Sequence, residues 1–265
     1  MTRHAFTWGL CWFAFVGCQN KPPVERDGPA DPLPPAATSE PKTAEKAAPP
    51  TAAPPAATPA AVTAKKKYVV FALGDSITDE HVGGGGYLKF LRHVCPKSEF
   101  LDFGKGGDMT NQMRRRFEVD VVPLVRARGG TTLLVYGGVN DLYSNLTAGR
   151  TNDRIEDDLS AIYRDARELG LEVVALTVSP WGGFTRYFNA SRSENTRLLN
   201  SWILGQVTAG PLRTAVDTYP LLSCGEPEKL CLEYENRRPD GLHPGPRGHE
   251  LLGRAVFEKA FSDCE

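Results

Sequence analysis

The sequence predicts an α/β domain whose core is a doubly wound parallel sheet with helices on both faces. Short apolar segments alternate along the chain with segments in which apolar residues recur at the spacing of one helix face. The segment 131–138 (TTLLVYGG) is apolar on both faces, as expected of a central strand. Strand–helix alternation of this kind places the crossover helices on both sides of a parallel sheet.

Five segments are expected to form strands and five to form helices. The strands are 67–74 (KYVVFALG), 99–104 (EFLDFG), 131–138, 171–180 (LEVVALTVSP) and the weaker 214–220 (TAVDTYP). The helices are 87–94, before Pro96; 110–128, interrupted near Pro123; 154–169, which starts after Asn152–Asp153 and stops at Gly170; 194–208; and 246–260. The third of these helices carries Ile155, Leu159 and Ile162 on one face, which predicts that this face packs on the sheet.

The composition excludes some classes of partner. The chain has 31 basic and 32 acidic residues among 265, for a formal net charge of −1. Without a basic excess, no field draws the domain to nucleic acid or to an anionic membrane surface, and no nucleic-acid partner is expected. The segment 65–265, about 200 residues, is long enough for one domain with a full core. It contains no apolar run long enough to cross a membrane.

The first 18 residues resemble a bacterial lipoprotein signal. Arg3 and His4 precede an apolar run, and Gly17 stands before Cys18, the residue that would carry the lipid. Phe15 occupies the position where such signals prefer leucine. An ordinary signal peptide cut near Gly17 and an uncleaved anchor are the alternatives. Export is expected in each case, and the lipoprotein interpretation predicts a cell-envelope protein whose membrane contact is the N-terminal lipid anchor.

Residues 19–64 are predicted to be a disordered linker. Twelve of the 21 prolines lie between Lys21 and Ala64, together with many alanines and scattered charges. Such a composition cannot bury a core and favours extended conformations. The linker is therefore interpreted as a spacer between the N-terminus and the domain 65–265.

Four short segments with chemically useful side chains follow predicted strands or precede the last helix. They are GDSIT (74–78), FGKGGDMT (103–110), GGVND (137–141) and DGLHP (240–244). A serine on a turn after a strand can present its hydroxyl to a cleft. Asp240 and His243 are three residues apart, so the carboxylate can orient the imidazole while the other ring nitrogen faces the cleft.

Each of these segments has an ordinary structural explanation when taken alone. Gly-Asp-Ser is common in loops, and the glycines after the second strand can form a flexible turn. Asn140 can cap a helix or form an Asx-turn, and His243 can be a hydrogen-bonded loop residue. The G-x-S-x-G elbow of α/β-hydrolases is absent. The glycines around Lys105 do not form a phosphate loop either, because Lys105 is not followed by the Ser or Thr that this motif requires. The combination is therefore more informative than any single segment.

Together, the order and contexts of these segments resemble the SGNH (GDSL-type) hydrolase family. The first matches the family's GDS block, the third matches G-x-N-D and the fourth matches D-x-x-H. The second is looser, because Asp102 stands where the family often has asparagine in N-x-G-x-x-G. The resemblance covers about residues 67–260 and implies a serine esterase that works through an acyl-enzyme.

The resemblance also implies roles for individual residues. Ser76 would be the nucleophile, His243 the general base and Asp240 its orienting partner. The oxyanion would be held by the N–H groups of Ser76 and Gly107 and by the Asn140 side chain, with Gly106 as a near alternative to Gly107. Asp75 is expected to be structural and paired within its loop, and Asp141 is expected to cap a turn.

The topology supports convergence of these loops independently. In a flavodoxin-like sheet of order 2-1-3-4-5, the loops after strands one, two and three meet where such folds bind ligands. Ser76, Gly107 and Asn140 lie on those loops, and His243 lies at the same sheet edge before the last helix. A single site at this edge is therefore expected.

Four cysteines lie in the domain, and an exported protein tolerates disulfides. Four cysteines allow three pairings, and no C-x2-C spacing indicates zinc. The predicted topology places the first and last helices side by side, and Cys95 and Cys264 lie at their ends. We therefore predict a Cys95–Cys264 disulfide, with Cys224–Cys231 closing a small loop.

Two other functions are compatible with the same residues. One is acyl transfer to a sugar hydroxyl, and the other is a tethered binding protein without turnover. The expected substrate is a small-molecule or carbohydrate ester, and neither a cofactor nor a metal is expected. The aromatic residues after the fourth strand can line a substrate pocket or cover the sheet edge: Trp181, Phe184, Tyr187 and Phe188. The sequence does not predict the oligomeric state.

Overall fold

The computed structural model describes residues 64–265. The predicted signal segment with Cys18, and the linker as far as residue 63, lie outside the described residues. None of the helices within 64–265 is long and apolar enough to cross a membrane.

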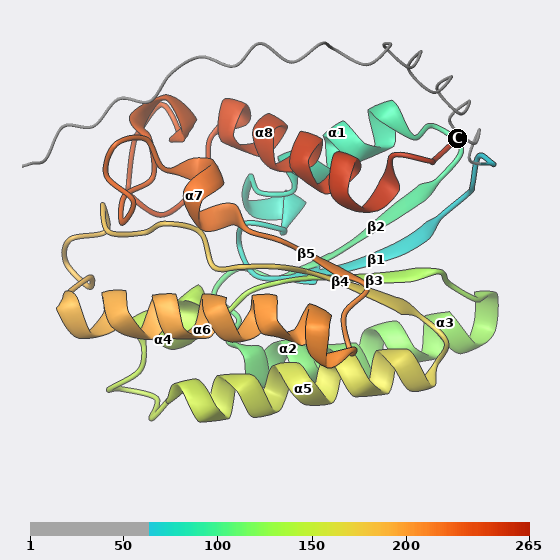
Figure 1. Ribbon diagram of the computed structural model, residues 1–265, viewed down its shortest axis with the longest axis horizontal. Coiled ribbons are helices and arrows are strands. Elements are labelled where there is room, and N and C mark those ends of the chain that lie inside the picture. Colours follow the sequence, from blue (N-terminus) through green and yellow to red (C-terminus); the bar gives the residue numbers. More distant parts are fainter. Residues whose placement is uncertain (1–63) are drawn as a thin grey trace, which may run out of the picture. The chain divides into compact units, whose positions relative to one another are not determined.

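The described residues are built on one sheet of five parallel strands in the order β2-β1-β3-β4-β5 (Figure 1). The strands are β1 (Val69–Gly74), β2 (Glu99–Gly104), β3 (Thr132–Tyr136), β4 (Glu172–Leu176) and β5 (Thr214–Val216). Val70 of β1 pairs with Phe100 of β2 on one side and with Thr132 of β3 on the other. This confirms the predicted order, in which the loops after β1, β2 and β3 share one edge.

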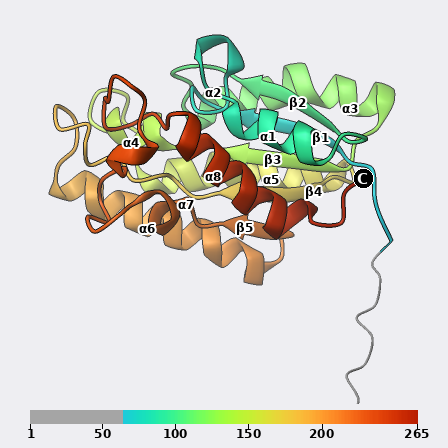
Figure 2. The ribbon, with the colours of Figure 1, turned by 90° about the horizontal axis from the view of Figure 1, so that it is seen from above.

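Helices cover both faces of this sheet (Figures 1 and 2). One face carries α1 (Gly86–Val94), α7 (Thr218–Leu222) and α8 (Pro246–Val256). The other carries α2 (Thr110–Arg116), α3 (Val122–Arg128), α5 (Asn152–Glu168) and α6 (Ala190–Ala209), and α4 (Val139–Tyr143) follows β3. Single-turn 3-10 helices span Glu80–Val82 and Leu232–Tyr234.

Alternate side chains of each strand enter two separate cores, because successive residues of a strand point to opposite faces. Phe71 and Leu73 of β1 pack with residues of α2, α5 and α6. Val70 and Ala72 pack with residues of α1 and α8. The buried strands therefore have the near-continuous apolar sequence expected of a parallel sheet covered on both faces.

Four strands are shorter than their predicted ranges, and two of them, β4 and β5, end four residues early. The segment 214–220 leaves the sheet after Val216, because Asp217 accepts a hydrogen bond from the Tyr219 N–H and begins α7. The fourth strand ends at Leu176 rather than Pro180. Beyond it, the Asn200 side chain of α6 bonds both the N–H and the C=O of Val178, replacing strand partners.

The helices also differ from their predicted ranges. The segment 110–128 is split by a π-helical stretch, Phe117–Val121, and Pro123 fits in the first turn of α3, where no N–H is needed. Helix α6 begins at Ala190 rather than at 194, because the Asn189 side chain caps its first turn. Helix α4 has only five residues and was not predicted.

Both predicted disulfides are present. Cys95 at the end of α1 bonds Cys264, with their Cα atoms 5.5 Å apart. Helices α1 and α8 lie side by side, as the topology predicts (Figure 2). Cys224 bonds Cys231, with a Cα separation of 5.2 Å, and closes a short loop between α7 and α8.

Candidate active site

The turn after β1 presents Ser76 at the carboxyl edge of the sheet. The Asp75 backbone oxygen accepts the N–H groups of Thr78 and Asp79, and Asp75 Oδ1 accepts the Ile77 N–H at 3.0 Å. These bonds fix the turn on both sides of the serine. Gly74 admits no side chain, since a Cβ there would lie 2.1 Å from Thr78 Oγ1.

A chain of hydrogen bonds joins the three residues that the resemblance assigned as nucleophile, general base and orienting carboxylate. Ser76 Oγ lies 2.8 Å from His243 Nε2, and His243 Nδ1 lies 2.6 Å from Asp240 Oδ2. Ser76 and His243 are 167 positions apart in the chain. The arrangement allows the imidazole to take the serine proton through one nitrogen while the other stays bonded to a carboxylate.

A tight turn holds the imidazole in this position. Asp240 Oδ1 accepts the N–H groups of Leu242 and His243, both at 2.9 Å. Partial burial disfavours the carboxylate, but the hydrogen bonds from His243 and Leu242 outweigh it and lower the pKa of Asp240. Asp240 is therefore ionised at neutral pH. Gly241 has φ +75° and touches Gly183 so closely that no side chain fits there.

Two backbone N–H groups, one of the serine itself and one of the loop after β2, are available to a ligand. Those of Ser76 and Gly107 have no acceptor among residues 64–265. Gly107 has φ +82° and lies in a turn closed by the bond from the Asp108 N–H to the Lys105 oxygen. The neighbouring Gly106 N–H already donates to Asp79 Oδ2 at 2.9 Å. This geometry favours Gly107 over Gly106 as an oxyanion donor.

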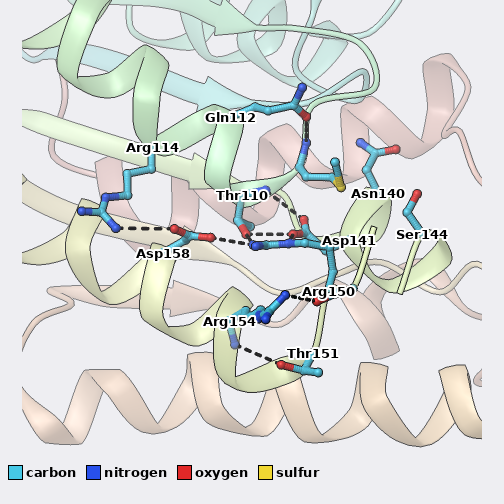
Figure 3. A network of polar contacts seen from close by, with 12 residues as sticks. Thr110, Gln112, Arg114, Asn140, Asp141, Ser144, Arg150, Thr151, Arg154 and Asp158 are labelled. Carbon is cyan, nitrogen blue, oxygen red and sulfur yellow. Dashed lines mark hydrogen bonds and ion pairs between the residues drawn. The ribbon is translucent and has the colours of Figure 1, made fainter. Parts of the chain in front are cut away.

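Asn140 lies in the first turn of α4, close to the same loop (Figure 3). Its Nδ2 donates to the backbone oxygen of Asp108 at 3.0 Å. An amide nitrogen carries two hydrogens, so this bond orients the second hydrogen for a ligand. Asn140 and the Gly107 loop are thus linked directly.

Arg116 holds three segments at this edge together, which sequence reasoning missed. Its guanidinium donates to the Asp108 carboxylate at 2.5 Å and to the backbone oxygens of Phe103 and Gly74. It therefore ties the ends of β1 and β2 to the loop that carries Gly107. The sequence offered no signal for this role, since Arg116 follows two other arginines in the helical segment.

A cavity of about 500 Å³ opens beside the serine. Its lining includes Ser76, His243, Val82, Asn236 and His249. A second cavity of about 580 Å³ also has Asp240 in its lining and is bordered by the Cys224–Cys231 disulfide. Asp240 is thus common to the linings of both cavities.

His249 is a second imidazole in the cavity wall. It is 5% exposed and stacks on Tyr87, with ring centroids 6.2 Å apart. Burial lowers the pKa of His249 to about 4, so the ring is neutral at neutral pH. Its spacing before Leu252 and Val256 on α8 could have identified it as a residue of the buried helix face.

Asp75 beside the nucleophile is buried, and its pairing is incomplete. Oδ1 bonds the Ile77 N–H, as expected of a structural residue, whereas Oδ2 has no partner among residues 64–265. Burial raises the pKa of Asp75 to about 6.

One cluster near the site has metal-ligand chemistry. Potential ligand atoms of Asp79, His81 and Asp102 lie within 4.8 Å of one another. All four carboxylate oxygens already accept backbone N–H groups of the surrounding loops. These contacts account for the two carboxylates as loop-holding groups.

The aromatic residues after β4 divide into two groups. Trp181 is buried, donates to Thr196 Oγ1 and packs edge-on against Phe188, so this pair covers the sheet edge. Phe184 and Tyr187 form a half-buried cluster with Tyr143 of α4. This second group lies one helical turn beyond Asn140.

Known proteins resemble the chain in both sequence and fold. A family model described as "GDSL-like Lipase/Acylhydrolase family" matches residues 72–251. A GDSL-like lipase from Bacteroides thetaiotaomicron is 23% identical, with a TM-score of 0.59 over 72% of this chain and 86% of that one. An acetyl xylan esterase is 19% identical, with a TM-score of 0.57 over 72% and 98% of the two chains. No curated protein matches the sequence.

A lipase/acylhydrolase from Enterococcus faecalis has a TM-score of 0.57 at 19% identity, over 72% of this chain and 94% of that one. At such identities the solved structures show the shared fold. The family match goes further, because it spans more than half of the chain and contains the segments around Ser76, Gly107, Asn140 and His243. The chain therefore belongs to the GDSL-like lipase/acylhydrolase family and is an SGNH-type ester hydrolase.

Proposed function

We propose that the chain is a serine esterase that cleaves carboxylic esters through an acyl-enzyme, with Ser76 as the nucleophile. The observation that carries the proposal is the chain of hydrogen bonds from Ser76 through His243 to Asp240, which opens onto a cavity. A serine hydroxyl is a weak nucleophile at neutral pH and needs a base within hydrogen-bond reach. His243 Nε2, 2.8 Å from Ser76 Oγ, meets this requirement.

The first half of the reaction transfers the acyl group to the enzyme. Ser76 Oγ attacks the ester carbonyl while its proton passes to His243 Nε2. The tetrahedral intermediate collapses when the bond to the leaving alcohol breaks and His243 gives that alcohol the proton. Asp240 keeps the proton of the neutral ring on Nδ1 and stabilises the imidazolium.

Water then repeats these steps on the acyl-enzyme and releases the acid. In both halves the negative charge develops on the former carbonyl oxygen. The N–H groups of Ser76 and Gly107 and the free Asn140 amide hydrogen are the donors we assign to it. Donors fixed before the reaction need no reorganisation when the charge appears.

The test compares wild type with Ser76→Ala on a p-nitrophenyl ester and with a fluorophosphonate probe. We expect turnover to fall to background in the variant and the probe to label wild type at Ser76, as located by peptide mass spectrometry. Retained turnover in Ser76→Ala would refute the nucleophile assignment. A folded wild type that neither reacts with the probe nor turns over would instead indicate a binding protein.

For the substrate, we propose an acetylated carbohydrate or another short acyl ester. The similar acetyl xylan esterase supports this class, and the two cavities that share Asp240 offer space for a bulky alcohol part. A chain-length series of p-nitrophenyl esters, run beside acetylated xylan and peptidoglycan, measures the preference. A rising rate from acetate to octanoate would contradict it.

We further propose that the protein is exported and held at the cell envelope through a lipid on Cys18. The sequence of residues 1–18 supports this, and two disulfides in the domain suit an oxidising compartment. Labelling with a fatty-acid probe in wild type and Cys18→Ser is the test. An equally labelled Cys18→Ser variant would exclude the anchor.

A further inference from the structure

A buried ion pair, Asp141–Arg150, begins at the residue that follows Asn140 (Figure 3). Asp141 is 0% exposed and Arg150 is 8% exposed. Arg150 Nε donates to Asp141 Oδ1 at 2.7 Å, and its Nη2 donates to Thr110 Oγ1 and to Asp158 Oδ2. The catalytic mechanism proposed above uses neither member of the pair.

The pair connects the two segments that carry the donors. Asp141 follows Asn140 in α4, and its Oδ2 accepts the N–H of Thr110, the first residue of α2, at 2.9 Å. Asp141 Oδ1 accepts the Thr110 hydroxyl at the same distance. Thr110 lies three positions after Gly107. The Asn140–Asp108 bond runs across the same gap, so α4 and the Gly107 loop are joined twice.

Neither donor segment has enough structure of its own to hold its position. Helix α4 has five residues, fewer than an isolated helix needs, and the Gly107 loop is a turn with positive φ. In some proteins, buried charged groups with several hydrogen bonds fix geometry even where they add little net stability. Figure 3 shows the guanidinium of Arg150 between the Asp141 and Asp158 carboxylates, which a lysine could not bridge in the same plane.

We propose that the Asp141–Arg150 pair positions the oxyanion donors Asn140 and Gly107. It acts through those two residues, without touching substrate, and the proposal rests on the ester-hydrolase mechanism above. Loosening the pair displaces the donors from the developing oxyanion but leaves Ser76, His243 and Asp240 bonded to one another. The expected consequence is a lower kcat at a nearly constant KM.

The test uses Asp141→Asn and Arg150→Met, with Arg164→Met as the matched control. Arg164 is an exposed α5 arginine whose ion pairs lie on the surface. Removing one oxyanion donor outright typically costs about 10²–10³-fold in kcat, so displacing the donors should cost on the order of 10–100-fold. We expect KM within about threefold of wild type in both pair variants, and the control unchanged.

A double-mutant cycle with Asn140→Ala separates positioning from general destabilisation. If the pair acts through Asn140, Asp141→Asn should lower kcat much less in the Asn140→Ala background than in wild type. Rates are expressed per serine that a fluorophosphonate labels at completion, so misfolded protein is not counted. Equal factors in both backgrounds, or an unchanged kcat in Asp141→Asn, would overturn the proposal.

Thr110→Val provides a milder variant in case the charge changes prevent folding. It removes the hydroxyl that both members of the pair contact and keeps the backbone N–H. The expected kcat lies between those of wild type and Asp141→Asn, and an unchanged kcat counts against positioning. Failure of the mechanism itself is distinguishable, because Ser76→Ala would then retain turnover.

Discussion

The turn that carries Asp240 and His243 is held mainly by its own Asp240 carboxylate, whereas the segments that carry Gly107 and Asn140 are held by two arginines, Arg116 of α2 and Arg150 of the loop before α5. On the first side, Asp240 supplies both the acceptor for the imidazole and the acceptor for the turn's own N–H groups. On the second side, Arg116 and Arg150 reach across separate elements. The comparison indicates that the acid–base side is fixed locally and the oxyanion side by tertiary contacts.

Asp240→Asn, on the acid–base side, should have the largest effect on kcat. An asparagine oxygen can still accept the N–H groups of Leu242 and His243, so the turn survives, but its NH2 group opposes the tautomer that the base needs. We expect kcat to fall by about 10⁴-fold with little change in the melting temperature. Steady-state kinetics and thermal unfolding check both.

Glu235→Gln is the control for Asp240→Asn. Glu235 accepts the Gly241 N–H in the same loop and has no hydrogen bond to Ser76 or His243. Like Asp240→Asn, this variant replaces a carboxylate with an amide and removes one negative charge. Its kcat should stay within about threefold of wild type. A drop similar to that of Asp240→Asn would mean that loop charge, rather than tautomer control, sets the rate.

Asn140→Ala should have the next largest effect and tests the opposite side. It removes the amide donor and the bond to Asp108, and a lost oxyanion donor typically costs about 10²–10³-fold in kcat. KM should change little. If the loss appears in KM instead, Asn140 contributes to ground-state binding, and only the backbone N–H groups of Ser76 and Gly107 remain as oxyanion donors.

The stability of the acid–base side should also depend on pH, because the buried ring of His249 lines the same cavity as His243. Burial lowers the pKa of His249 to about 4, below the value of about 6.5 in an unfolded chain. The unfolded state then binds the proton more strongly. His249 should therefore contribute a loss of about 3 kcal/mol of stability as the pH falls from about 6.5 to about 4.

His249→Phe should abolish this part of the pH dependence and keep the stacking on Tyr87. Free energies of unfolding in urea at pH 7 and pH 4 measure the difference between variant and wild type. His93→Phe, which replaces an exposed imidazole on α1, is the matched control. The same pH dependence in His249→Phe and wild type would show that this ring is not the proton-sensitive group.

The sequence predicts the acid–base side better than the oxyanion side, and for a physical reason. Strand order, the position of Ser76 and the Asp240–His243 turn follow from apolar runs and short motifs, whose information is local. The partners of Arg116 and Arg150 lie as many as 42 positions away, and a charged residue of a helix or loop usually faces solvent. Asp141 accordingly bonds Thr110 and Arg150 in the core, instead of capping a turn of its own segment.

The smallest expected effect distinguishes the two glycines of the loop after β2. Alanine at Gly107, where φ is +82°, costs roughly 1–2 kcal/mol of backbone strain, and a change of φ that relieves the strain also turns the Gly107 N–H away. We expect kcat of Gly107→Ala to fall about tenfold. At Gly106 a Cβ meets its nearest atom at an ordinary 3.6 Å, so Gly106→Ala should stay within about threefold of wild type. The opposite ranking would assign the oxyanion N–H to Gly106, and would mean that its bond to Asp79 opens when substrate binds.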